Sequence, residues 1–178
     1  MKVCLYGAGR NKINKEYLEE GYLLGKRLSE NGHSLVFGAG NRGMMGAVSK
    51  GFNDNNARIL GISTVFMSEF QEVCEYCSEI IYAKSMDERK KLFVEHSDCF
   101  IISPGGIGTL DELFEILTLK NLERIDKPII IFNINGFYDP LIFLLNDMVD
   151  EGFIKPSFNS LFEVCDNIED IVNLLKKY

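Results

Sequence analysis

Short apolar runs alternate with longer amphipathic segments along most of the chain. A short apolar run is typical of a buried strand, whereas apolar residues three and four positions apart predict one face of a helix. We therefore predict strands at residues 3–6, 34–40, 57–63, 79–83, 98–103, 127–133 and 160–165. Helices are predicted at residues 17–32, 44–56, 85–97, 109–122, 139–152 and 168–178, and residues 64–78 are expected to be irregular.

Strands that alternate with helices predict a parallel sheet with helices on both of its faces. The apolar runs are continuous, as expected for strands that are buried on both sides. No repeat, low-complexity segment or linker interrupts the 178 residues. The fold class predicted is α/β, with a Rossmann-like, doubly wound parallel sheet in a single domain over residues 1–178. In such folds, ligands bind in the loops at the carboxyl ends of the strands.

The composition limits the kinds of partner that the protein is expected to have. Hydrophobic residues make up 46% of the chain and charged residues 25%, as in average globular proteins. The net charge of −7 argues against nonspecific binding to nucleic acid or to an anionic membrane, because both need a basic field. No apolar run approaches the roughly 20 residues of a membrane span, and the N-terminus enters a strand-like run rather than a signal peptide. We expect a cytoplasmic protein that binds a small molecule, with neither nucleic acid nor membrane as a partner.

The five cysteines agree with a reducing compartment. Cys74 and Cys77 form a CxxC pair, but a zinc site needs further ligands, and the two histidines, His33 and His96, are isolated in the sequence. A redox pair usually opens a helix after a strand, whereas this pair lies in the acidic segment QEVCEYCSE. A structural role is the favoured interpretation, and no metal site is predicted.

Two glycine-containing loops follow the first two predicted strands. YGAGRNKINKEY (6–17) contains GxG but lacks the complete GxGxxG pattern. FGAGNRGMMG (37–46) has GxGxxG at Gly38, Gly40 and Gly43, but the next strand ends without the acid that would hold a ribose diol. A dinucleotide site is therefore weakly supported. The glycines either expose backbone N–H groups to an anion or let the helix pack closely, and the sequence leaves both interpretations open.

A third loop, SPGGIGT (103–109), lies between the most strand-like run and the clearest helix, where a phosphate-binding loop is expected. It lacks the GKS or GKT ending of an ATP-type P-loop. The alternative is structural, because Thr109 and Glu112 have the spacing of a capping box, in which each side chain accepts a hydrogen bond from the other residue's backbone N–H. Considered alone, this spacing favours the capping box.

An arginine lies on the predicted helix that precedes this loop. In SMDERKKLF (85–93), Met86, Arg89 and Phe93 share one helical stripe. Arg89 is either a solvated edge residue, which the local pattern favours, or a fixed cation that reaches a phosphate or carboxylate over the strand ends.

Taken together, these segments resemble the LONELY GUY (LOG) family over nearly the whole chain, from residue 3 to about residue 175. PGGIGTLDE is similar to the family's PGGxGTxxE motif, and SMDERKK to its MxxRK motif. FGAGNRGMMG resembles the family's GGGxxGLMG loop, with Ala39 in place of the middle glycine and Met44 in place of leucine. DKPIIIFNINGFYDPL and EGFI are also similar to family segments.

The resemblance implies a homodimer that cleaves the N-glycosidic bond of nucleoside 5′-monophosphates, which are cytokinin nucleotides or AMP. The products are a free base and ribose 5-phosphate, and no cofactor or metal is implied. An older label for such sequences is lysine decarboxylase, but nothing in the sequence supports the lysine that would bind pyridoxal phosphate. The implied catalytic residues are Arg89 and Glu112. The implied substrate- and phosphate-binding residues are Gly105, Gly106, Gly108, Thr109, Met86, Lys90, Gly7 and Gly40.

The two motifs also change the interpretation of Glu112. In a parallel sheet, the helix of SMDERKK precedes the strand that ends in PGGIGT, so Arg89 can face Glu112. A carboxylate that points at Arg89 cannot also close a capping box. The contact between these two side chains therefore decides between the interpretations.

The first loop departs from the family, whose members often carry a serine-rich CGSS there. YGAGRNKIN loses those hydroxyl donors, and Arg10, Asn11 or Lys12 could supply replacements. This departure bears on which substrate is bound more than on which type of bond is cleaved. Two other functions stay open: a noncatalytic nucleotide or molybdenum-cofactor carrier, because such carriers look similar in fold and glycine loops, and an oxidoreductase that binds NAD at FGAGNRG.

Overall fold

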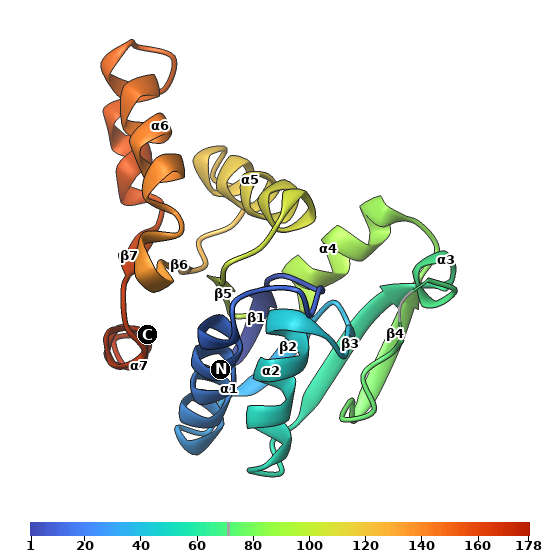
Figure 1. Ribbon diagram of the computed structural model, residues 1–178. Helices are drawn as coiled ribbons and strands as arrows, with labels where there is room; N and C mark the ends of the chain where they lie inside the picture. The colour runs from blue at the N-terminus through green and yellow to red at the C-terminus, as the bar shows by residue number, and fades with distance from the viewer. Residues whose placement is uncertain (71) are drawn as a thin grey trace.

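In the computed structural model, which describes residues 1–70 and 72–178, seven strands form one sheet (Figure 1). Their order is β4-β3-β2-β1-β5-β6-β7, and every neighbouring pair is parallel. This confirms the predicted Rossmann-like α/β class. The strands are β1 (Lys2–Tyr6), β2 (Ser34–Phe37), β3 (Ile59–Thr64), β4 (Glu79–Ala83), β5 (Cys99–Ile102), β6 (Ile129–Phe132) and β7 (Glu163–Cys165).

Helices cover both faces of this sheet (Figure 1). They are α1 (Lys15–Glu30), α2 (Gly43–Asn53), α3 (Val65–Ser68), α4 (Met86–His96), α5 (Ile107–Asn121), α6 (Asp139–Asp150), α7 (Ile168–Leu175) and the short 3-10 helices η1 (Ile134–Gly136) and η2 (Pro156–Ser160). Within the two described ranges, no helix is long and apolar enough to cross a membrane.

Alternate residues of the same strands pack against opposite layers of helices. Val3 and Leu5 of β1 belong to a core cluster with residues of α1, α2 and α7. Cys4 and Tyr6 belong to a second cluster with residues of α4, α5 and α6. The inner strands β1, β2, β3, β5 and β6 are buried on both faces, so both sets of their positions are apolar, which explains the continuous apolar runs in the sequence. The edge strands β4 and β7 are partly exposed.

The direction of the chain across the sheet reverses at β1. Strands β2, β3 and β4 extend the sheet on one side of β1, and β5, β6 and β7 extend it on the other. Leu5 pairs with Phe37 of β2, and Tyr6 pairs with Ile102 of β5, so these three strands end side by side. The three glycine-containing loops of the sequence therefore meet at the position where open α/β sheets bind ligands.

Differences between predicted and observed ends of elements have local causes. β2 ends at Phe37 rather than at residue 40, because Ala39 has φ +60°, in the left-handed region. The last strand begins at Glu163 rather than at residue 160, because the preceding residues form η2. The segment 64–78, expected to be irregular, contains the single helical turn α3, and its residue 71 lies outside the described residues.

Glycine allows α1 and α2 to pack at very short distance. A Cβ atom at Gly25 would lie 2.2 Å from the Val48 carbonyl oxygen, and one at Gly51 would lie 2.3 Å from the Tyr22 carbonyl oxygen. Both clashes involve backbone atoms, so a side chain at either position would force the two helices apart.

We expect Gly25→Ala to lower the free energy of unfolding by about 2–3 kcal/mol, the cost of overpacking a tight contact. Urea denaturation measures this change. Lys26→Ala, at the adjacent exposed position of α1, is the matched control and should change the free energy by less than about 0.5 kcal/mol. Alanine normally stabilises a helix relative to glycine, so an increase in stability of Gly25→Ala would contradict the close contact.

Candidate active site

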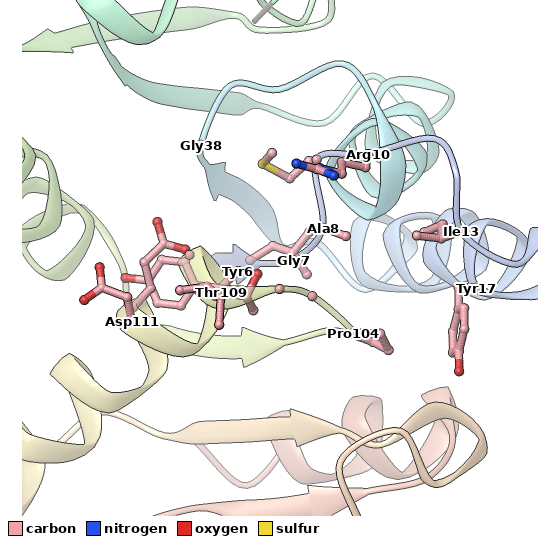
Figure 2. A pocket seen from close by; sticks show the side chains of 18 of the residues that line it. Tyr6, Gly7, Ala8, Arg10, Ile13, Tyr17, Gly38, Pro104, Thr109 and Asp111 are labelled. Carbon is pink, nitrogen blue, oxygen red and sulfur yellow. The ribbon is translucent and has the colours of Figure 1, made fainter. Parts of the chain in front are cut away.

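A cavity of about 790 Å³ opens at the carboxyl ends of β1, β2 and β5 (Figure 2). Its volume is in the range of small-molecule and cofactor sites. The three glycine-containing loops contribute to its wall, together with residues of α1, α4 and α5. Among its lining residues are these residues singled out from the sequence: Gly7, Met86, Arg89, Gly105, Gly106, Gly108, Thr109 and Glu112.

A buried ion pair joins α4 to α5 at this cavity. Arg89 Nη1 donates a hydrogen bond to Glu112 Oε1 at 3.0 Å, and the two side chains are 5% and 13% exposed. Arg89 Nε donates to the Ile62 carbonyl oxygen at 3.0 Å, and its guanidinium lies 4.7 Å from the centre of the Phe93 ring. The local pattern favoured a solvated edge residue, but Arg89 is a fixed, buried cation.

Glu112 does not form a capping box with Thr109. α5 begins at Ile107 with Gly106 as its N-cap residue, and no side chain accepts a capping hydrogen bond there. Thr109 is already inside the helix, so its hydroxyl is not at the position from which an N-cap acts. The capping interpretation of the Thr-x-x-Glu spacing is therefore wrong, because the helix begins earlier than that spacing predicts.

A related cap occurs instead at the start of α4. Ser85 Oγ accepts a hydrogen bond from the Glu88 backbone N–H at 3.1 Å, and the Glu88 carboxylate accepts one from the Lys84 backbone N–H. The backbone N–H of Arg89 then donates to the Ser85 carbonyl oxygen at 3.0 Å. The residues just before Arg89 thus fix the first turn of α4 and with it the position of the arginine.

The first turn of α5 presents unpaired backbone donors to the cavity. In the part of the chain that the structure describes, the N–H groups of Ile107, Gly108 and Thr109 have no protein acceptor. A Cβ atom at Gly106 or Gly108 would meet no atom within 4 Å, so open space reaches the backbone at both glycines. Unpaired N–H groups and the helix dipole together favour binding of an anion.

Gly105 has a different role from the glycines that follow it. A Cβ atom there would lie 2.1 Å from Thr109 Oγ1 and 2.6 Å from Thr109 Cβ. Glycine at this position therefore lets the loop fold back against the branched side chain of Thr109.

The start of α2 is occupied by the first loop rather than open to a ligand. The Gly43 backbone N–H donates to Asn11 Oδ1 at 2.9 Å, and the Met45 backbone N–H donates to the Ala8 carbonyl oxygen at 3.3 Å. A Cβ atom at Gly43, where φ is +60°, would lie 2.5 Å from that Ala8 oxygen. The glycines of the loop 37–46 were interpreted either as exposing backbone N–H groups to an anion or as letting the helix pack closely. The structure supports close packing.

Two residues implied by the resemblance lie away from the cavity lining. Lys90 Nζ pairs with Asp111 at 2.8 Å and with Glu115 at 2.9 Å, and these contacts raise the pKa of the lysine. Gly40 forms an isolated antiparallel bridge with Val73. A motif gives the positions of residues along the chain but does not show which of them reach the cavity. A residue next to a lining residue can therefore lie outside the lining.

Other lining residues were not identified from the sequence. Gly38, noted in the sequence only as part of GxGxxG, lines the cavity in another role, because a Cβ atom there would lie 2.5 Å from Arg89 Nη2, so glycine makes room for the guanidinium. Tyr17 and Phe137 also line the cavity, with their rings edge-to-face at 6.0 Å. These aromatic residues come from segments far apart in the sequence, and only the fold brings them together (Tyr17 is labelled in Figure 2).

The CxxC pair lies outside this cavity lining. Cys74 is buried in the core cluster of α1 and α2, and its Sγ donates to Ser49 Oγ at 3.4 Å. Outside residue 71, no group of three or more metal-ligating side chains is present. The packing of Cys74 agrees with a structural role.

Burial raises the pKa of Glu112 to about 7, although the charge and hydrogen bond of Arg89 act in the opposite direction. A carboxyl group with this pKa exchanges its proton near neutral pH, as a general base or acid must. A perturbed carboxyl group beside a fixed cation and an open anion site is typical of an active site.

Comparisons with known proteins agree with these features. A family model described as "Possible lysine decarboxylase" matches residues 45–175. The chain is 34% identical over 177 residues to the cytokinin riboside 5′-monophosphate phosphoribohydrolase LOG5 of Arabidopsis thaliana, covering 99% of this chain and 78% of that protein. It is 32% identical over 177 residues to the cytokinin riboside 5′-monophosphate phosphoribohydrolase LOG of Oryza sativa subsp. japonica, covering 99% and 73%.

Solved structures share the fold. The molybdenum cofactor binding protein from the phototrophic bacterium Rippkaea orientalis has a TM-score of 0.74 at 22% identity, covering 99% of this chain and 96% of that one. At this identity, the similarity establishes the fold alone.

The cavity does not fit the lysine decarboxylation that the family model's description suggests. That reaction would rest on pyridoxal phosphate bound to a lysine. No lysine lines the cavity as far as the structure describes it, and Lys90 on the adjoining helix is paired with Asp111 and Glu115.

Glu112→Gln should change the pH dependence of stability in a defined direction. The pKa of Glu112 is raised on folding from near 4.5 to about 7. The native state therefore holds the proton more tightly, and the wild type loses stability as the pH rises through this window. Relative to Glu112→Gln, we expect a loss of about 3 kcal/mol between pH 4 and pH 8. Urea denaturation of both proteins over this range measures the difference, and parallel pH curves would contradict the raised pKa.

Gly108→Ala should weaken anion binding without weakening the fold. The added methyl group enters the open space at the first turn of α5, and alanine is favoured over glycine in a helix by about 0.5–1 kcal/mol. We expect thermal stability equal to or above that of the wild type, with a lower affinity for inorganic phosphate in isothermal titration calorimetry. Gly32→Ala, at a glycine outside the cavity lining with φ +78°, should lower thermal stability but leave phosphate affinity unchanged. Equal phosphate affinity of Gly108→Ala and wild type would show that the anion does not approach this turn.

Proposed function

The chain belongs to the LONELY GUY (LOG) family, and from this premise we propose that it hydrolyses the N-glycosidic bond of nucleoside 5′-monophosphates to a free base and ribose 5-phosphate. Relatives with full-length similarity are named cytokinin riboside 5′-monophosphate phosphoribohydrolases, and cytokinin nucleotides or AMP are the substrates that we propose. The observation that carries the proposal is the buried pair of Arg89 and Glu112 in the cavity that also receives the open end of α5.

The first turn of α5 provides the binding site for the 5′-phosphate. Its three unpaired N–H groups and its dipole favour a dianion, and Gly106 and Gly108 leave space for close approach. The phosphate is remote from the bond that breaks. Its binding energy can therefore hold the ribose in position for reaction at C1′.

Glu112 is the residue that we propose to act on C1′. When the N-glycosidic bond breaks, its electron pair leaves with the base, which takes up a proton, and the sugar gains positive charge. The carboxylate stabilises this charge and accepts a proton from the water whose oxygen forms the new bond to C1′. With its pKa at about 7, Glu112 is partly ionised at neutral pH and can both accept and release that proton.

Arg89 fixes and orients this carboxylate. Its guanidinium is held by the Ile62 carbonyl oxygen and the Phe93 ring, so it does not have to reorganise during the reaction. Its hydrogen bond to Oε1 favours the ionised form of Glu112 and sets the direction of the carboxylate. Asp111 is the other acidic residue in the lining. It pairs with Lys90 and therefore lacks a hydrogen bond from the buried Arg89.

We also propose that the protein is a cytoplasmic homodimer. Large apolar side chains are exposed on α6 and just after it, with Phe143 68%, Leu144 48% and Phe153 81% exposed. Exposed apolar residues that gather in this way are typical of protein interfaces. The free cysteines Cys4, Cys74, Cys77, Cys99 and Cys165 support a reducing compartment.

A panel of nucleoside monophosphates and nucleosides tests the proposed reaction, with the released base measured by chromatography. We expect base release from AMP or a cytokinin riboside monophosphate, and a fall in kcat of about 10²- to 10⁴-fold in Glu112→Gln. Glu115→Gln, one turn along the same helix and outside this cavity, is the matched control and should retain activity.

Two outcomes would contradict the proposal. Full activity of a folded Glu112→Gln variant would exclude the catalytic role of the carboxylate. Binding of a pterin cofactor, without turnover of any nucleotide in the panel, would favour a carrier instead.

A further inference from the structure

The first loop offers three side chains that could replace the serine hydroxyls common in the family, and the structure distinguishes between them. Asn11 is engaged, because its Oδ1 accepts a hydrogen bond from the Gly43 backbone N–H at 2.9 Å. Lys12 and Arg10 are both exposed, but Lys12 does not line the cavity. Arg10 does line it, and Figure 2 shows its side chain extending from the first loop toward Gly38.

The backbone around Arg10 is held between the other two glycine-containing loops. The Ala8 backbone N–H donates to the Pro104 carbonyl oxygen at 3.1 Å, which joins the first loop to PGGIGT. On the other side, the backbone of Arg10 is so near α2 that a Cβ atom at Gly43 would lie 2.7 Å from the Arg10 carbonyl oxygen. The backbone of the first loop is therefore anchored on both sides of the cavity, and the exposed side chain of Arg10 extends from this anchored segment.

Arg10 differs from the other charged groups of the cavity in having no counterion. The charged side chains in the lining are Arg10, Arg89, Asp111 and Glu112. Arg89 pairs with Glu112, and Asp111 pairs with Lys90. Within residues 1–70 and 72–178, no carboxylate forms an ion pair with Arg10. It is thus a cation at the cavity whose charge is available to a ligand.

We propose that Arg10 binds the phosphate of the substrate together with the first turn of α5. This inference rests on the proposed function and specifies how this chain recognises its nucleotide. The N-terminus of a helix carries only about half a positive charge, whereas a phosphate monoester carries close to two negative charges at neutral pH. The guanidinium supplies a full charge and two parallel N–H donors, a geometry that matches phosphate oxygens.

A phosphate contact at Arg10 makes selection of the substrate depend on charge. Serine hydroxyls bind a neutral or a charged oxygen, but an unpaired guanidinium gains most from an anion. Arg10 then discriminates between a nucleoside 5′-monophosphate and the nucleoside without phosphate. The first turn of α5 still holds the phosphate and positions the ribose when the Arg10 side chain is removed, so loss of this contact acts mainly on binding, and the chemical step stays with Glu112 and Arg89.

Steady-state kinetics with AMP and calorimetric titration with ribose 5-phosphate test this role in the full-length protein. For Arg10→Ala we expect KM for AMP and Kd for ribose 5-phosphate to rise about 10- to 100-fold, as for loss of a charged hydrogen bond, with kcat changed much less. Arg10→Lys should recover part of the affinity, because it keeps the charge but not the paired donors. Lys12→Ala removes the same charge from the same loop outside the cavity and should match the wild type.

The outcomes separate this inference from the proposed function. An unchanged Kd for ribose 5-phosphate in Arg10→Ala would overturn the phosphate contact. So would an equal loss of affinity for AMP and for adenosine, since this would place Arg10 on the nucleoside. If the wild type releases no base from any nucleotide, but Arg10→Ala still weakens binding of ribose 5-phosphate, the proposed reaction fails and the phosphate contact stands.

Discussion

The buried ion pair between Arg89 and Glu112 is the interaction on which the candidate site depends. Removing two charges from water costs several kcal/mol for each, and only good geometry with additional hydrogen bonds offsets that cost. Arg89 has such partners, because the Ile62 carbonyl oxygen and the Phe93 ring hold its guanidinium in addition to Glu112. Glu112 has Arg89 as its one hydrogen-bond partner in the described part of the chain. The cost of burial therefore falls mainly on the carboxylate that faces the cavity, and the pKa of Glu112 rises.

The fold holds this unfavourable arrangement through the packing around it. α4 and α5 lie on the same face of the sheet, and Phe93 of α4 shares a core cluster with Leu113 of α5. Phe93 lies one helical turn after Arg89, and Leu113 directly follows Glu112, so apolar packing sets the separation of the charged groups. The cap at Ser85 and Glu88 fixes the first turn from which Arg89 extends. The apolar packing and the helix cap are thus favourable in themselves, and they hold the ion pair in position.

The sequence predicts the fold well because the periodicity of apolar residues and the glycine loops are local signals. The site is predicted less completely, because its geometry depends on contacts between distant segments. The spacing of Thr109 and Glu112 matches a capping box, and only the separate SMDERKK motif pointed to Arg89 as the partner of Glu112. Phe137 lies in a segment that is similar to the family, but nothing in the sequence marked it as a cavity residue, since its place in the cavity follows from the route of the chain after β6. Lys90 and Gly40 belong to matching motifs, but neither lines the cavity, because Lys90 pairs with Asp111 and Glu115 and Gly40 forms a bridge with Val73, and spacing alone does not reveal this.

The charged side chains of the cavity come from opposite layers of the protein. The reacting pair is carried by α4 and α5 on one face of the sheet, whereas the first loop leads from β1 into α1 on the other face. That loop is anchored by the Ala8 backbone N–H to Pro104 and by contacts at Gly43, and neither anchor uses the side chain of Arg10. The side chain at position 10 can therefore vary without displacing Arg89 or Glu112. The buried ion pair and the side chain of Arg10 are thus held in place by separate sets of contacts.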